Sequence, residues 1–536
     1  MQSLRELSNR HDGIELFMRR YDDDRAPPHV EAVIEYCRGI SESDFRDTSM
    51  MSRGNAWLDD RAVPTTPTAA GTRHPTALEA IAIQQHNAEC DIADAQGEHP
   101  MLSTQSIVPE ARTYEESLTA WDLRRHLLEK RFNHNSLEDA DRRLIHIANP
   151  SPCHMLALAE TANEHQAPAI QDLLGRYLTL QTSMKVRIPT EGYPVFQLEH
   201  HFPYFGLHMT RLEDVVKSES SKPDQKIWMD LSFLDSKNER GTLRIYRARS
   251  SFTLSGFNNT HWIAYDLEEV NFNPDREIGE DERNDFRRSD QISMGKFDAN
   301  LPFYDAREYY LAISLIRVKC ARKEAQRIVG QIEASFMHHM TSCPFSAASA
   351  SEQSAISKWN EPMLELLSML IQDLRGKVDC WNSFKSKDLD YFSDPDETLL
   401  PRVIAHIERT INELDDVYED LRVYEKTLSY FQEACEKLAN RLEYRLSLQG
   451  GKIGEFTIVV ISPVVIVSSI FAIPTSVLPY EQSFLSLFLS VGAVMMLLWF
   501  LLLLKEGWLS QQAWWQSLSR RVWTLRRQSK RAETNK

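Results

Sequence analysis

The stretches FTIVVISPVVIVSSIFAI (456–473) and FLSLFLSVGAVMMLLWFLLLL (484–504) decide the fold of this 536-residue chain. The first has four polar residues among 18, and the second has two among 21. A membrane core about 30 Å thick requires roughly 20 helical residues, so each stretch is long enough to span it. We therefore expect two transmembrane helices, joined by the link 474–483. Two buried core helices are the alternative.

The charges around these stretches predict the topology. Lys452 precedes the first, and residues 505–536 carry eight basic and two acidic residues, so this tail is +6 and the rest of the chain is −22. Lys and Arg mark the cytoplasmic side, so an integral membrane protein with both termini in the cytosol is expected. The tail should bind anionic lipid headgroups, with a specific partner as the alternative. Because the rest of the chain is acidic, nucleic acid is not an expected partner. The basic residues expected to contact the headgroups are Arg520, Arg521, Arg526, Arg527, Lys530 and Arg531.

A long amphipathic helix is expected directly before the first span. Residues 402–449 contain neither Pro nor Gly, and a helix of this length is on the order of 70 Å long. Pro401 suits its first turn, and Gly450-Gly451 offers a hinge. Apolar residues recur in steps of three and four, typical of a coiled-coil or bundle seam. They are Ile404, Ile407, Ile411, Leu414, Val417, Leu421, Tyr424, Leu428, Phe431, Cys435, Leu438 and Leu442.

The rest of the chain predicts an α+β cytosolic domain followed by this α-helical stalk and a two-helix C-terminal transmembrane hairpin. Helices are expected near 169–180, 305–340 and 352–377. Strands are expected at 155–159, 195–201, 227–231, 243–254 and 262–266, and a solvated loop at 273–290. Seven cysteines without a CxxC pair and a start without an apolar signal segment favour the cytosol. The expected regions are 1–110 with a Ser/Thr/Pro-rich, partly disordered linker, 111–300 as the α/β domain, 301–400 as a helical region, 401–455 as the stalk, 456–504 as the hairpin and 505–536 as the tail.

Catalytic motifs are absent from the sequence. It contains no GxGxxG after a strand, no GxxxxGK[ST], no HExxH and no GxSxG, so we do not expect an enzyme. His200-His201 with His208, and His338-His339, are possible metal ligands. No second ligand pair stands at zinc spacing, so ordinary surface or packed histidines are the simpler interpretation. Acidic stalk residues normally form a solvated face. If several stalks assemble around an axis, however, Glu413, Asp416 and Asp420 could hold a divalent cation.

This organisation resembles the CorA-like family of divalent-cation transporters. The resemblance is strongest in the first apolar stretch, at Thr457, Ser462-Pro463 and Ser468-Ser469-Ile470-Phe471. The segments 202–207, 230–235, 251–256 and 262–265 also look like the CorA-like proteins of filamentous fungi, and the resemblance covers roughly residues 150–510. The family's Gly-Met-Asn signature is missing, because the equivalent positions are Ala472, Ile473 and Pro474.

The resemblance implies a homo-oligomer, pentameric in the family, whose first transmembrane helix lines a pore. The pore-lining candidates are Thr457, Ser462 and Val465. The implied activity is passive transport of a divalent cation, magnesium or zinc, which is the expected substrate or regulator. Pro474 has no side-chain donor or acceptor to hold a hydrated ion. A non-conducting, membrane-anchored scaffold or sensor that retains the fold is therefore the rival interpretation.

Overall fold

The computed structural model divides the chain into two compact units, Met1–Cys435 and Glu436–Lys536. The residues that it describes are 13–19, 29–40, 55–63, 112–115, 117–189, 195–210, 228–234, 242–269, 289–342, 350–393, 400–456, 461–471, 485, 488–497 and 500.

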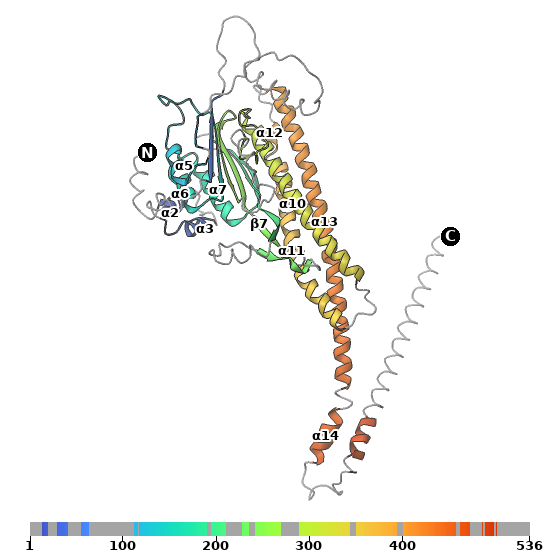
Figure 1. The fold of residues 1–536 in the computed structure, drawn as a ribbon. Helices are drawn as coiled ribbons and strands as arrows, with labels where there is room; N and C mark the ends of the chain where they lie inside the picture. Colours follow the sequence, from blue (N-terminus) through green and yellow to red (C-terminus); the bar gives the residue numbers. More distant parts are fainter. Residues whose placement is uncertain are drawn as a thin grey trace, which may run out of the picture. The chain divides into compact units, whose positions relative to one another are not determined.

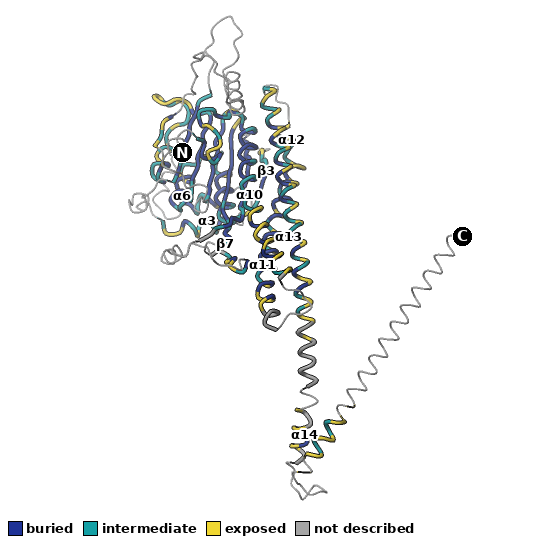
Figure 2. Tube along the Cα trace, turned by 45° about the vertical axis from the view of Figure 1, so that its right-hand side comes forward, coloured by how far each residue is buried: buried dark blue, intermediate teal, exposed yellow. Residues whose placement is uncertain are grey.

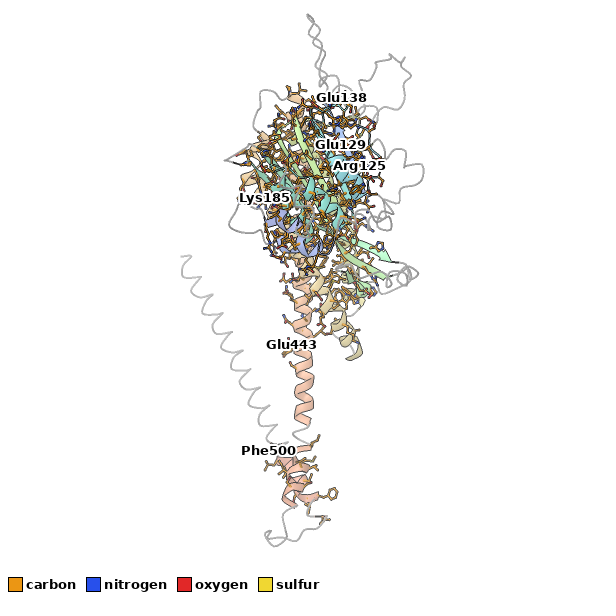
Figure 3. The ribbon with its side chains drawn as sticks, turned by 90° about the vertical axis from the view of Figure 1, so that its left-hand side faces the viewer. Arg125, Glu129, Glu138, Lys185, Glu443 and Phe500 are labelled. Atoms are coloured by element: carbon orange, nitrogen blue, oxygen red, sulfur yellow. The ribbon has the colours of Figure 1, made fainter. Side chains whose placement is uncertain are left out.

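The first unit is built on a mixed six-stranded sheet (Figure 1). Strands β2 and β9 are parallel, and every other neighbouring pair is antiparallel. The edge strand β3 presents the exposed Lys185 (Figure 3), a charge that discourages pairing with another chain. The strands, in sheet order, are β1 (Ala56–Arg61), β2 (Arg142–Ala148), β9 (His261–Glu268), β8 (Ser250–Asn258), β4 (Phe196–His201) and β3 (Ser183–Arg187).

A smaller three-stranded antiparallel sheet, in the order β5-β7-β6, lies beside the long helices. Its strands are β5 (Tyr204–Thr210), β6 (Trp228–Asp230) and β7 (Thr242–Ala248), and the short 3-10 helix η1 (Ser232–Leu234) follows β6. Glu324 Oε2 of helix α10 (Ala306–Ser342) accepts a hydrogen bond from the Leu207 backbone N–H at 3.1 Å. This contact satisfies a donor on β5 and ties the small sheet to α10.

Short helices cover one face of the large sheet and bury an apolar core. Side chains from β2 and β9, such as Ile145, Ile263 and Leu267, pack against Leu173 and Leu174 of α7. The residues alternate inward along both strands, as expected for a sheet covered by helices. The helices are α2 (Gly13–Arg19), α3 (Val30–Tyr36), α5 (Ala120–Leu127), α6 (Pro152–Thr161) and α7 (Ala167–Thr179).

Long helices cover the opposite face, and the interior there is rich in aromatic rings. Trp262 Nε1 donates to the backbone oxygen of Tyr304 at 2.8 Å, and the Tyr310 hydroxyl donates to the backbone oxygen of Glu199 at 2.7 Å. Both rings are buried together with their polar atoms, whose desolvation these bonds offset. Figure 2 shows the strands as almost entirely buried. Besides α10, this layer contains α11 (Ala350–Lys387), α12 (Asp390–Ser393) and the part of α13 (Pro401–Phe456) that belongs to the first unit.

The structure confirms the predicted stalk helix. Helix α13 has 56 residues, corresponding to about 84 Å, begins at Pro401 and continues through Gly450-Gly451. Eight of the twelve seam residues are buried, and the other four are half-buried. The periodic apolar residues therefore form the packed side of the helix.

Other expectations were wrong in detail. Residues 155–159 lie in helix α6, because Ser151 and Pro152 start a helix there, and a short apolar run alone does not distinguish a strand from a buried helix. The expected strand 243–254 is two strands, β7 and β8. Asp290, assigned to a solvated loop, is buried. The expected region 1–110 with its partly disordered linker stays a prediction, and it includes β1, which pairs with β2.

Two glycines provide a matched test of the packing. A Cβ on Gly256, beside the irregularity between β8 and β9, would lie 2.5 Å from the backbone oxygen of His261 and 2.7 Å from Trp262 Cβ. Because backbone atoms cannot move aside cheaply, Gly256→Ala should destabilise the protein by about 1–3 kcal/mol. Gly330→Ala on the open surface of α10 should instead stabilise it by about 0.5–1 kcal/mol. Denaturant midpoints of the two variants measure these effects. Equal shifts of the two midpoints would contradict the close packing around Gly256.

Candidate functional site

The membrane-associated candidates fall mostly outside the described residues. Helix α14 (Ser462–Phe471) covers ten residues of the first apolar stretch, and residues 488–497 of the second are helical. Among the residues that the structure describes, no helix is both long enough and apolar enough to cross a membrane. The candidates outside the described residues are Thr457, Ala472, Ile473, Pro474, Arg520, Arg521, Arg526, Arg527, Lys530 and Arg531.

Within α14, the candidate pore residues sit in the first turn. Ser462 is its first residue and Pro463 its second, where a missing backbone N–H costs least. Val465 is 58 % exposed, whereas Val467 is 2 % exposed. The predicted pore lining therefore remains a prediction, with one of its three residues, Val465, on an exposed surface of the chain.

The stalk carboxylates Glu413, Asp416 and Asp420 follow one another at steps of three and four residues along one side of α13. Glu413 pairs with Lys319 at 2.6 Å and Asp420 pairs with Arg322 at 2.8 Å, both basic partners being on α10. Asp416 lies between them on the same helix face and is exposed. Within one chain, Glu413 and Asp420 therefore have basic partners on α10, in ion pairs that are largely exposed. The predicted cation site between several stalks concerns an assembly and stays a prediction.

The histidine pair on β4 is buried on both sides of the sheet. His200 stacks on Phe202 with ring centroids 5.4 Å apart, and both of its ring nitrogens lack a hydrogen-bond partner among the described residues. Burial lowers the pKa of His200 to about 3 and lowers that of His201 well below its usual value. Both rings are therefore neutral core side chains. Of the second histidine pair, the His339 ring stacks on Trp359.

A group of charged residues that the sequence analysis missed lies between the sheet and α10. His146 Nδ1 is 2.6 Å from Asp266 Oδ2, and Arg317 Nη2 of α10 donates to the same oxygen at 2.8 Å. Arg317 Nη1 is 3.0 Å from Glu268 Oε1. Burial alone would lower the pKa of Arg317, but Asp266 and Glu268 raise it above its usual value. We call His146, Asp266, Glu268 and Arg317 the buried charge cluster.

The local fold explains why these side chains meet. In the parallel pair, His146 of β2 lies opposite Asp266 of β9, and Glu268 follows two residues later on the same face. Arg317 also donates to the backbone oxygen of Ile292 at 2.9 Å, so it joins β9, α10 and the 289–300 segment. The sequence did contain a signal, namely acidic residues at alternate positions of an otherwise apolar strand. The partners of Asp266, however, are Arg317 and His146, which lie 51 and 120 residues away in the sequence. No local pattern connects residues so far apart.

Two further ion-pair networks lie along the sheet. Asp60 is bound by Arg143 at 2.6 Å and accepts from the Tyr114 hydroxyl at 2.7 Å; burial would raise its pKa, but Arg143 holds it below the usual range. Glu199 pairs with Arg187 at 2.8 Å, yet burial raises its pKa. In both networks a basic side chain pairs with the buried carboxylate, so the networks hold neighbouring elements together.

Comparisons with known proteins yield only distant structural likeness. No family model and no curated protein matches the chain. Among solved structures, it is similar to the full-length CmaX protein, with 11 % identity, a TM-score of 0.31 and coverage of 69 % of this chain and 91 % of that one.

It is also similar to the CorA magnesium transporter from Methanocaldococcus jannaschii, with 11 % identity, a TM-score of 0.29 and coverage of 69 % and 92 % of the two chains. The cytoplasmic domain of ZntB from Vibrio parahaemolyticus RIMD 2210633 matches with 10 % identity, a TM-score of 0.28 and coverage of 57 % and 93 %. Likeness at this level does not identify a family.

Proposed function

We propose that this chain is a CorA-like integral membrane protein that conducts a divalent cation, magnesium or zinc, through a pore lined by its first apolar segment. The observation that carries the proposal is helix α13. It is continuous for 56 residues, packs on α10 and α11 over its N-terminal part, and ends at Phe456, where the first span-length apolar segment begins. Such a helix can carry movement from an α/β unit to a pore.

The sequence that follows α13 agrees with this proposal. Two apolar stretches of 18 and 21 residues, separated by only ten, fit a transmembrane hairpin with both ends on the basic, cytosolic side. A single first helix encloses no pore, so the active form is a homo-oligomer, with five copies as in the resembling family. Membrane lipid is the other partner, held by the basic tail. The proposed activity is transport, without catalysis.

The chemistry of the proposed pore sets an expectation for its ions. Thr457 and Ser462 supply hydroxyl groups, whereas Val465, Ala472, Ile473 and Pro474 supply no side-chain ligand. A magnesium ion gives up its water reluctantly, so it should pass hydrated or be held by backbone carbonyls. A non-conducting anchored scaffold is the second candidate, favoured by the missing signature.

Ion entry into proteoliposomes that contain the purified chain separates these two functions. Fluorescent reporters for magnesium and zinc inside the vesicles follow the influx, and vesicles without protein give the leak. Saturable entry of either ion supports transport. Oligomeric, correctly inserted protein that admits neither ion is a scaffold, and the transport proposal is then wrong.

A further inference from the structure

Three side chains of the kinds that bind transition metals meet inside the first unit. His146, Asp266 and Glu268 are all buried and each offers one ligand atom, and these atoms lie within 4.8 Å of one another. In the described part of the chain, this is the one such group of three or more. Strands β2 and β9 fix the ligands in register on one face, so the group is held by the most rigid part of the fold.

The hydrogen bonds of Asp266 leave one of its two carboxylate oxygens without a described partner. His146 and Arg317 both contact Oδ2, whereas no described group donates to Oδ1, although Asp266 is completely buried. A buried carboxylate oxygen without a partner is costly, and a metal ion is one of the groups that satisfies it.

We propose that His146, Asp266 and Glu268 form a binding site for a divalent transition-metal ion of the zinc type. One imidazole and two carboxylates are typical zinc ligands, whereas magnesium prefers an all-oxygen shell. Arg317 is the competing cation, since its guanidinium contacts both carboxylates. Metal binding therefore replaces the contacts that Arg317 of α10 makes with Asp266 and Glu268 of β9. The site does not depend on the chain being a transporter.

Zinc titration of the full-length, chelator-treated protein tests this site. The variant His146→Gln removes the nitrogen ligand while keeping a donor for Asp266, and it should weaken zinc binding at least tenfold. His126→Gln is the matched control, because the half-buried His126 also lies beside carboxylates, 3.2 Å from each of Glu115 and Glu129, but outside the proposed site. Its neighbours Arg125 and Glu129 are labelled in Figure 3. Equal loss in both variants, no loss in His146→Gln or no zinc binding by the wild type would overturn the proposal.

A second variant tests the competition with the guanidinium. Arg317→Met removes the competing charge, so folded Arg317→Met protein should bind zinc about tenfold more tightly than the wild type. Zinc should also raise its thermal midpoint more than that of the wild type. Unchanged or weaker zinc affinity in folded Arg317→Met protein would contradict the proposal that Arg317 competes with the metal ion. If this variant does not fold, the comparison of His146→Gln with His126→Gln decides alone.

Discussion

Replacing Arg317 by Met should destabilise the first unit by about 3–5 kcal/mol, because it leaves Asp266 and Glu268 buried without their main counter-charge. Arg317 is 3 % exposed in its side chain, and its two carboxylate partners are 0 % and 5 % exposed. The loss of unfolding free energy therefore arises because two buried carboxylates lose the charge of Arg317. Denaturant unfolding of the full-length protein in detergent, monitored by tryptophan fluorescence, measures it.

Helix α10 offers a matched control for this substitution. Arg322 has the same side chain five residues later and pairs with Asp420 at 2.8 Å, but the two side chains are 37 % and 49 % exposed. Exposed ion pairs contribute little, so Arg322→Met should cost less than about 1 kcal/mol. Equal destabilisation by the two substitutions would show that the buried charge cluster does not anchor α10 to the sheet.

Mild acid should destabilise this protein, because core histidines are buried in the neutral form. Burial lowers the pKa of His154 to about 4 and that of His200 to about 3, from an ordinary 6.5. Their stabilising contribution is present above pH 6.5 and is lost as the pH falls towards these values. At pH 5, each histidine should cost about 2 kcal/mol relative to pH 7.5. Glu199 and Asp290, whose pKa values are raised by burial, offset part of this loss.

The variant His200→Phe isolates one contribution to the acid sensitivity. It keeps a ring against Phe202 and removes two unpartnered nitrogens, so it should be at least as stable as the wild type at pH 7.5. The difference in unfolding free energy between pH 7.5 and pH 5 should shrink by about 2 kcal/mol. His338→Phe, at an exposed position, should leave that difference unchanged. The same pH profile in both variants would mean that His200 is not buried in the neutral form.

The parts of the fold that could be predicted from sequence are those with a local period. The seam of α13 shows a repeat of three and four residues, and its packed side is the predicted one. Helices α10 and α11 likewise lie close to their expected ranges, although α11 extends ten residues beyond the expected Lys377. These predictions succeed because burial of one helix face is repeated over many turns.

The missed elements depend on distant partners. Strand β2 contains Arg142, Arg143 and His146, so it does not look like a buried strand until Asp59 and Asp60 of β1 neutralise the two arginines. The buried charge cluster was missed for the same reason. Residues that are polar in sequence become core residues only when the chain brings their counter-charges from β9 and α10.

The central claim is that the first apolar segment lines a pore, and ion influx through paired tryptophan variants tests it most directly. Ser462→Trp places a bulky ring at a proposed pore-lining position, whereas Leu489→Trp places the same ring on the second segment, where the side chain is 67 % exposed. Influx of magnesium or zinc into proteoliposomes should be abolished by Ser462→Trp and largely retained by Leu489→Trp. Equal influx through both variants, or none through the wild type, would contradict the claim.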